Sequence, residues 1–420
     1  MPDALLVAVD LALVVLVARC GGALAVRLGE PRIAGEMIGA ILVGPTVLGG
    51  QVAGVVDGAI AGGTVGALFP AAAVDVLTVV GGVGMILYML LVGMAIDAGP
   101  MGRRAGSILL MALAVVAAAC AVAVAAAWWL GAGADWRGPD TTRLAFALAL
   151  AGALAAQGVP IAARILEERG LMRTEIGATV IAIGATVTTI ALLVSGVAVR
   201  GANLAAVAEL GLVIAAGAVV VAIIAPLRHS SSRRLSPRVA MVPLVVIALG
   251  AGAGGKALLG TILIGPLLVG IAVRNAGFTA AVLEAHLGAL VRGVLLPVFL
   301  GVAALHTNLR ELLHADALPQ ALAVIVAIVV VKAGAGIASA RAAGFGGPEA
   351  RVLGALVQCG GVMTIAVSLD LLQAGLVTTR THALLTLVGL VTTLLAGPLL
   401  ARSGLRAPAA ARAAPALHDA

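Results

Sequence analysis

The chain has 420 residues, of which 62% are hydrophobic and only 11% charged, and its mean hydropathy is +1.18. Soluble domains are about half apolar and a quarter charged, so this composition excludes a soluble protein and indicates one that a bilayer covers. The net charge of +7 is expected of a membrane protein that keeps Lys and Arg in its cytoplasmic loops, so it does not indicate a nucleic-acid partner.

Apolar runs, separated by turn residues and charges, predict thirteen transmembrane helices. We expect them near residues 4–27, 33–49, 76–97, 105–131, 143–168, 175–199, 203–226, 238–253, 256–273, 283–305, 317–341, 349–374 and 380–402. The eighth and ninth are the least clearly divided, because only the glycine-rich residues 250–255 separate them. A short basic tail, residues 403–420, follows the last helix and is expected to be cytoplasmic.

The loop charges support this arrangement of helices. If the carboxyl terminus is cytoplasmic, that side holds roughly three times as many Lys and Arg residues as the outer side, which satisfies the positive-inside rule. An even number of helices would place several basic loops on the wrong side. The sequence therefore predicts a multi-pass protein of the cell (inner) membrane, with its amino terminus outside.

Two predicted helices carry matching interruptions. The fifth reads GALAAQGVPIA at 152–162 and the twelfth reads GALVQCGGVMTIA at 354–366. In each, Gln157 or Gln358 precedes residues that weaken a helix, since proline lacks an N–H donor and glycine is permissive. Backbone freed at this depth must line a cavity or be buried in protein. Paired interruptions in inverted repeats indicate a transporter binding site, although Gly and Pro are also simply common in membrane helices.

Three further stretches form an ordered set with these interruptions. They are GEPRIAGE at 29–36 with ILVGP at 41–45, LLVGMAID at 90–97, and the stretch from LPVF at 296–299 to ALHTNL at 304–309. From about residue 10 to 402, the chain resembles the cation:proton antiporter-2 family, the Kef-type and sodium/proton exchanger group.

The resemblance implies an all-α membrane fold of inverted repeats with two crossed discontinuous helices, spanning residues 1–402. It implies a homodimer whose panel elements, about 4–97 and 203–305, hold the interface. Core elements, about 105–199 and 317–402, would move against them to alternate access. The expected partners are monovalent cations, protons and the lipid bilayer, with no cofactor, no bound metal cofactor and no enzyme activity.

The chain departs from the family where the family usually has its charges. Thr188 and Thr189 stand where exchangers of the family carry an acidic pair, midway along the sixth helix. In the twelfth helix the family's Arg and Glu are both lost, and Thr364 takes the place of the Glu. Lys332 matches the family's lysine in the eleventh helix.

These residues define the predicted ion or substrate site: Gln157, Thr188, Thr189, Lys332, Gln358 and Thr364. Threonine cannot ionise, so it could ligate a cation only as a neutral oxygen, and such a site binds hard cations weakly. Alternatively, both threonine hydroxyls simply bond to the preceding turn of their own helix.

Lys332 has three candidate roles. A charged lysine at the bilayer centre costs about 2.5–3.5 kcal/mol, so it should face protein or water. It could carry the proton by alternating between ammonium and amine, or it could be a counter-ion for an anionic substrate. It could also be structural, held by helix carbonyls and by Gln157 or Gln358.

Other ionisable residues carry weaker expectations. Glu36 and Asp97 lie near predicted cytoplasmic ends, where solvated or capping roles are expected. Asp10 and Arg19 share the first helix and could pair, and Asp370 falls inside or at the edge of a span.

Three functions are compatible with the sequence. The first is a secondary active transporter that exchanges Na⁺ or K⁺ for protons through an atypical site. The second is a proton-coupled transporter of an organic or anionic solute, which a neutral Thr/Gln site with one lysine would suit. The third is a homologue that does not transport and keeps the fold for binding or regulation.

Overall fold

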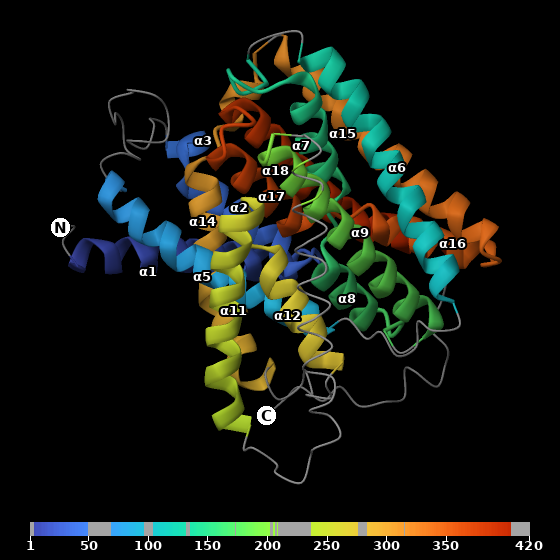
Figure 1. Ribbon diagram of the computed structural model, residues 1–420, viewed down its shortest axis with the longest axis horizontal. Coiled ribbons are helices and arrows are strands. Elements are labelled where there is room, and N and C mark those ends of the chain that lie inside the picture. The colour runs from blue at the N-terminus through green and yellow to red at the C-terminus, as the bar shows by residue number, and fades with distance from the viewer. Residues whose placement is uncertain are drawn as a thin grey trace.

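The computed structural model is helical in the part of the chain that it describes (Figure 1). Those residues are 4–48, 69–95, 104–131, 135–172, 174–201, 205, 208, 237–275, 284–314 and 316–404. The predicted seventh helix (203–226), Asp97 and the tail beyond residue 404 therefore fall outside the described residues, apart from residues 205 and 208.

The first half of the chain forms eight described helices. They are α1 (Ala4–Arg27), α2 (Arg32–Val43), α3 (Pro45–Leu48), α5 (Ala71–Ala95), α6 (Ala105–Leu130), α7 (Arg143–Ala155), α8 (Val159–Glu168) and α9 (Glu175–Val199). The second half begins with α11 (Pro237–Leu259) and α12 (Ile264–Asn275), followed by the π-helical turns η2 (Glu284–Gly288) and η3 (Val291–Leu295). It continues with α14 (Leu296–Leu305), the 3₁₀ turn η4 (Leu309–Leu312), α15 (Ala317–Ala342), α16 (Gly347–Val357), α17 (Gly361–Gln373) and α18 (Thr379–Ala401).

Ten helices in the described part of the chain are long and apolar enough to cross a membrane, counting α7–α8 and α16–α17 as one span each. A shorter apolar helix, Ile264–Arg274, accompanies them. The predicted all-α membrane class is confirmed. Among the described residues the helices lie near the predicted ranges, except that Gly44 divides the predicted helix 33–49 into α2 and α3 and that one boundary between helices is displaced.

The displaced boundary is the one between the eighth and ninth predicted helices. The sequence placed it at residues 250–255, but α11 continues through these glycines and ends at Leu259. The chain turns at Gly260, which has a φ of +71°. A left-handed residue just past the last turn ends a helix, whereas glycines with ordinary helical dihedrals do not. The glycine run was therefore the wrong signal.

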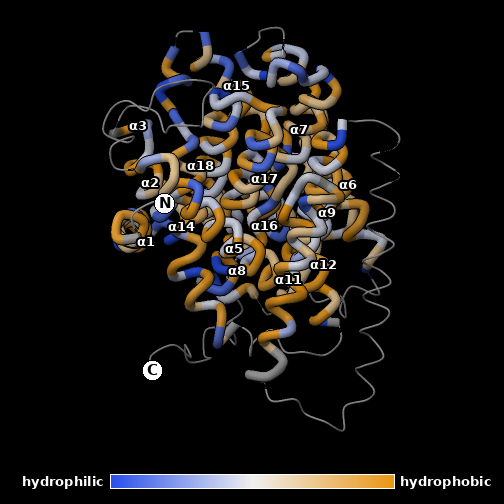
Figure 2. Tube along the Cα trace, turned by 60° about the vertical axis from the view of Figure 1, so that its left-hand side comes forward, coloured by the Kyte–Doolittle hydropathy of each residue, from blue (hydrophilic) through white to orange (hydrophobic). Residues whose placement is uncertain are grey.

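Burial separates the spans into two kinds. The most apolar window of Gly347–Gln373 is completely buried, and that of Arg143–Glu167 is 83% buried. The corresponding windows of α1 and α11 are only 22% and 17% buried, and Figure 2 shows both as largely apolar tubes. An apolar helix that exposes most of its side chains needs lipid or another apolar surface against it. The two interrupted helices are thus the interior of the bundle.

The helices pack in two groups. In one, α6 contacts α7 and α15, α7 contacts α9, α15 contacts α16, and α17 contacts α18. In the other, α1 packs on α2, α5 packs on α12 and α14, and α11 packs on α12. Glycines permit close approach in the second group, since a Cβ on Gly93 of α5 or on Gly270 of α12 would collide with the facing backbone. The groups meet where α14 contacts α17 and α2 contacts α18.

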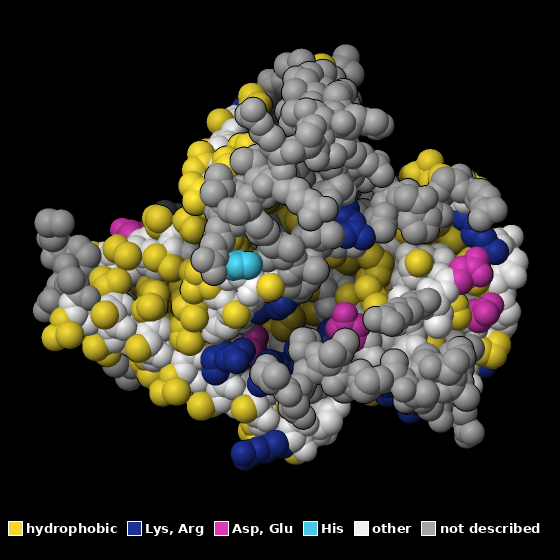
Figure 3. All heavy atoms as spheres, turned by 90° about the horizontal axis from the view of Figure 1, so that it is seen from below, with side chains coloured by type: hydrophobic (Ala, Val, Ile, Leu, Met, Phe, Trp, Pro, Cys, Tyr) yellow, Lys and Arg dark blue, Asp and Glu magenta, His cyan; other side chains and the backbone are white. Residues whose placement is uncertain are grey.

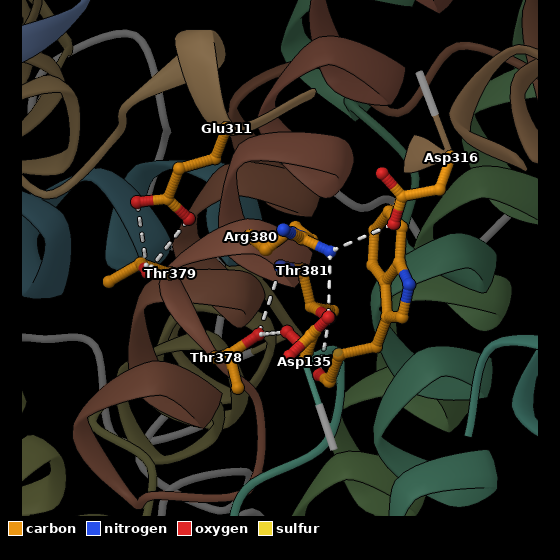
Figure 4. Close-up of polar contacts among 8 residues, drawn as sticks. Asp135, Glu311, Asp316, Thr378, Thr379, Arg380 and Thr381 are labelled. Carbon is orange, nitrogen blue, oxygen red and sulfur yellow. Dashed lines mark hydrogen bonds and ion pairs between the residues drawn. The ribbon is translucent and has the colours of Figure 1, made fainter. Parts of the chain in front are cut away.

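A cluster of charged and polar side chains around Arg380 joins the start of α18 to its neighbours (Figure 4). Arg380 Nη1 lies 3.2 Å from Asp135 Oδ2, in the segment between α6 and α7, and 3.7 Å from Asp316 Oδ2, just before α15. Its guanidinium also lies over the ring of Trp136, 5.6 Å from the centroid. One arginine therefore ties three helix ends together.

The threonines beside Arg380 extend this cluster. Thr378 Oγ1 donates to the backbone carbonyl of Asp135, and Thr379 Oγ1 donates to the Glu311 carboxylate of η4 (Figure 4). Thr378 also accepts from Thr381 N, which caps α18. The cluster fixes the position of α18, whose far half supports one of the interruptions described below.

The face of the molecule seen in Figure 3 is mixed in character. Lys and Arg side chains gather at its centre and right, together with acidic ones, while its left part is mostly hydrophobic. Several helices end or begin with arginine, among them Arg27 at the end of α1 and Arg341 in the last turn of α15. Arginine at these helix ends is typical of a bundle that spans a membrane.

Candidate functional site

The first interruption separates α7 from α8. The helix stops at Ala155 and restarts at Val159, with Pro160 in the first turn of the new helix, where its missing N–H costs nothing. Gln157 is completely buried within this gap. Gly158 N donates to the carbonyl oxygen of Cys359 at 2.9 Å, so the gap is linked directly to the second interruption.

The second interruption separates α16 from α17. α17 begins at Gly361, which has a φ of +57°, and a Cβ there would collide with the side chain of Ile161. This position therefore needs glycine both for its backbone conformation and for space. Thr392 of α18 supports the gap: its Oγ1 accepts from Gly360 N at 3.1 Å, and its carbonyl accepts from Gln358 Nε2 at 3.0 Å.

The two interruptions cross each other in the middle of the buried spans. Besides the bond from Gly158 N to Cys359 O, Gln157 Nε2 donates to Leu356 O at 3.3 Å. The predicted pair of crossed discontinuous helices is confirmed. Backbone groups that each helix loses at its break are satisfied partly by the other helix, which is how irregular backbone can exist at this depth.

Lys332 of α15 lies against the first interruption, with only 1% of its surface exposed. Its Nζ donates to the carbonyl oxygens of Leu154 (2.9 Å), Ala155 (2.8 Å) and Ala156 (3.2 Å). These carbonyls form the end of α7, where the helix dipole is negative. An ammonium has three hydrogens, and all three are engaged here.

Thr188 and Thr189 behave differently from each other. Thr188 Oγ1 donates to Gln157 O at 3.0 Å and accepts from Gln157 N at 3.3 Å, so it bridges from α9 to the first interruption. Thr189 Oγ1 donates to Ala185 O, one turn earlier in its own helix. The expectation that both hydroxyls bond to the preceding turn is therefore wrong for Thr188 and right for Thr189.

Three buried polar atoms at the crossing have no hydrogen-bond partner within the described residues. They are Gln157 Oε1, Gln358 Oε1 and Thr364 Oγ1, and all three belong to residues that the sequence predicted for the site. A buried polar atom left unpaired costs about 1–3 kcal/mol, so its retention needs an explanation. Neutral oxygens that accept are also what a hard cation prefers as ligands. The crossing thus offers acceptors, but no negative side chain takes part in the hydrogen bonds described above.

Comparison with known proteins agrees with this geometry. A profile of the family described as "Sodium/hydrogen exchanger, transmembrane" matches residues 12–403, nearly the whole chain. The chain belongs to the sodium/hydrogen exchanger family. This finding confirms the family resemblance seen in the motifs at 29–45 and 90–97.

Individual relatives of this family member are distant. Cation/H(+) antiporters 19 and 18 of Arabidopsis thaliana are each 26% identical to it, over 382 and 295 residues. These matches cover 89% and 68% of this chain but 46% and 35% of the relatives, so the chain spans less than half the length of the relatives it matches.

A solved structure has the same fold. The sodium proton antiporter MjNhaP1 from Methanocaldococcus jannaschii, at pH 8, superposes with a TM-score of 0.66 at 13% identity. The match covers 96% of this chain and 99% of the other. At this identity the likeness concerns the fold alone.

The ionisable residues of α1 and α2 in this family member differ from expectation in two respects. Arg19 of α1 pairs with Glu36 of α2, with Nη1 3.1 Å from Oε1, and not with Asp10. The Glu36 side chain is 3% exposed, so it is not solvated. The reason is that α1 and α2 pack closely through Gly21 and Gly35, which places the side chains of Arg19 and Glu36 next to each other.

A buried histidine, His382 of α18, was not identified from the sequence. Its Nδ1 lies 2.8 Å from Ser368 Oγ of α17, and its Nε2 lies 3.2 Å from Ala303 O of α14. A carbonyl only accepts, so Nε2 carries hydrogen and Ser368 bonds to the other nitrogen. His382 therefore links the interrupted helix to the second helix group.

A carboxylate was also assigned no role by the sequence. Asp370 of α17 is 8% exposed, and its Oδ2 accepts from Thr261 Oγ1 at 2.6 Å. Asp370 and Thr261 are far apart in the chain, so only the fold could join them. An Asp within an apolar span was nevertheless a signal, because such residues are rare and usually functional.

Proposed function

We propose that this protein is a secondary active transporter that exchanges a monovalent cation, Na⁺ or K⁺, for protons. The observation that carries the proposal is the buried crossing of α7–α8 and α16–α17. Interrupted helices that cross at mid-depth present backbone ends and polar side chains to a substrate, while the surrounding helices change its access. Membership of the exchanger family and the names of the Arabidopsis relatives support the same function.

Within the crossing we assign the six predicted residues to two tasks. Gln157, Gln358 and Thr364 supply oxygens that accept from no donor among the described residues, so they are the candidate cation ligands. Thr188 and Lys332 hold the first interruption in shape through the hydrogen bonds described above. The Thr189 hydroxyl is engaged within its own helix, so it contributes least.

This division favours cation exchange over transport of an anionic solute. An anion would need the Lys332 ammonium as its partner, but all three hydrogens of that group bond to carbonyls. Oxygen acceptors, in contrast, suit a cation. We therefore assign Lys332 the structural role among the three considered above.

We also propose how the chain is organised in the membrane. The group containing α6–α9 and α15–α18 would be the core that moves, and the group containing α1, α2, α5, α11, α12 and α14 the panel. The exposed apolar faces of α1 and α11 suit a homodimer interface in the cell membrane. The arginines at the ends of α1 and α15 suit an arrangement with the amino terminus outside.

The test is ion flux in proteoliposomes with an internal pH dye. We expect external Na⁺ or K⁺ to drive proton movement, with choline as the control cation. Thr364→Val removes a hydroxyl without a partner and keeps the shape, so it should lower apparent cation affinity several-fold without destabilising the fold. Thr186→Val is the matched control, because the Thr186 hydroxyl bonds within α9.

Two results would count against the proposal. Wild-type protein that moves no protons in response to Na⁺, K⁺ or Li⁺ would favour the non-transporting alternative. Equal flux in Thr364→Val and wild type, at limiting cation concentration, would remove Thr364 from the site.

A further inference from the structure

A cavity of about 190 Å³ lies between the two helix groups. One wall is α17, which contributes Ala366, Asp370 and Gln373, spaced so that they share a helix face. The opposite walls come from α5, α14 and the segment that joins α11 to α12. A single water needs about 10–15 Å³ of such space, so a partly hydrated cation fits.

Asp370 is the acidic group of this cavity, and its surroundings are those of a built site. Thr261 Oγ1 accepts a hydrogen bond from Leu263 N at 3.2 Å. The hydroxyl of Thr261 donates its single hydrogen to Asp370 Oδ2 at 2.6 Å. Ile262 and Leu263, which follow Thr261 in the chain, line the same cavity. Both Thr261 and Asp370 are buried. Donors aimed at a carboxylate stabilise its charged form.

The charge around Asp370 is only partly balanced. Lys256 of α11 lines the same cavity and its positive charge acts on Asp370, but the described ion pairs include none between these two residues, and Lys256 is exposed. The walls from α5 and α14 present Thr78, Phe299 and Val302, which are uncharged. A carboxylate within an apolar span is expensive even with a lysine nearby, and such residues usually bind ions or protons.

The position of Asp370 connects the cavity to the crossing. It lies nine residues after Gly361 on α17, about 14 Å along the axis at 1.5 Å per residue. Of the α17 residues that line the cavity, Ala366 comes first along the helix, two residues after Thr364. The negative charge that the crossing lacks is therefore present on the same helix.

The bond between Asp370 and Thr261 joins the proposed core to the proposed panel. α17 belongs to the first group, and Thr261 lies between α11 and α12 of the second. Movement of one group against the other must break or re-form this bond, so whatever occupies the carboxylate affects that movement.

We propose that Asp370, with the Thr261 hydroxyl and Gln373 as neutral ligands, forms a second cation site further along α17 from the crossing, and that the transported cation and a proton compete for this carboxylate. When Na⁺ or K⁺ binds, the carboxyl group releases its proton to solvent, so one positive charge replaces another. The inference rests on the proposed function and adds an acidic site to the neutral oxygens of the crossing.

The experiment measures proton release when NaCl or KCl is added to the purified full chain in weakly buffered detergent, with choline chloride as the ionic-strength control. We expect wild type to release protons over a range of pH, and Asp370→Asn to release none. Asp75→Asn is the matched control and should behave as wild type, because Asp75 is an exposed carboxylate of α5 outside the cavity lining.

A second variant keeps the carboxylate. Thr261→Val should still release protons but should need a several-fold higher cation concentration, whereas Thr261→Ser should restore the wild-type value. If Asp370→Asn fails to fold, the Thr261 pair decides the question. An unchanged cation requirement in Thr261→Val would overturn the proposal, as would undiminished proton release by folded Asp370→Asn.

The outcomes separate this inference from the proposed function. Cation-driven flux in wild type without Asp370-dependent proton release would overturn the inference and leave the exchanger intact. Asp370-dependent release without any flux would overturn the exchanger function and leave the cation site.

Discussion

The two interruptions have the same backbone plan but are stabilised differently. At the first, an ammonium from α15 bonds to three carbonyls at the end of α7, and Thr188 of α9 bridges to Gln157. At the second, the groups are neutral: Thr392 of α18 accepts from Gly360 N, and Gln358 Nε2 donates to Ala355 O and Thr392 O.

This difference shows that the two interruptions share a backbone arrangement without sharing the chemistry that stabilises it. Both gaps need a glycine-containing turn and buried partners for the freed backbone, and any donor or acceptor of suitable reach meets that need. Charge is required at neither gap by geometry alone. The lysine at the first gap therefore indicates a larger demand for donors there, where three consecutive carbonyls converge.

The comparison is tested most severely by Lys332→Met. The substitution keeps a long apolar stem and leaves three buried carbonyls without their donor, so we expect a loss of about 3 kcal/mol in the free energy of unfolding. The readout is the unfolding midpoint in detergent. Lys256→Met, at the other lysine of the chain, should change it little because Lys256 is exposed. Equal effects of the two substitutions would contradict the role assigned to Lys332.

Gly361→Ala tests the second interruption. Alanine disfavours the left-handed backbone of this residue by about 1–2 kcal/mol, and its Cβ would also collide with Ile161. We expect a loss of about 2 kcal/mol, measured in the same way. Gly375→Ala is the control, because Gly375 has a φ of +72° with nothing near its Cβ position. The control measures the backbone cost alone. If Gly361→Ala destabilises the protein no more than Gly375→Ala does, the Ile161 side chain moves aside without cost.

Thr188→Val should have the smallest effect of the three, about 1 kcal/mol. It removes the hydroxyl that bonds to both Gln157 N and Gln157 O, while keeping the shape of the side chain. Thr189→Val, one position along, removes a hydroxyl that bonds only within α9, so its effect should be near zero. If the order of the two were reversed, the bridge from α9 to the first interruption would not contribute to stability.

Much of the architecture followed from the sequence. The interruptions at Gln157 and Gln358 were recognisable because helix-weak residues stood at matching points of two apolar runs. The buried lysine was recognisable because a charge within an apolar run must find a partner. The end of α11 was not, since a glycine's dihedral angles depend on what packs around it, and neither was the pairing of Arg19 with Glu36.

Local chemistry, then, is what the sequence by itself determined: an apolar chain must form membrane helices, and a gap between two helices must bury its freed backbone in protein. Only the tertiary structure decided which of two neighbouring threonines reaches the gap, which carbonyls receive Lys332, and that Thr261 meets Asp370 across a cavity. These are contacts between residues far apart in the chain. Their geometry depends on how whole helices pack, and a single helix's hydropathy pattern carries no record of that.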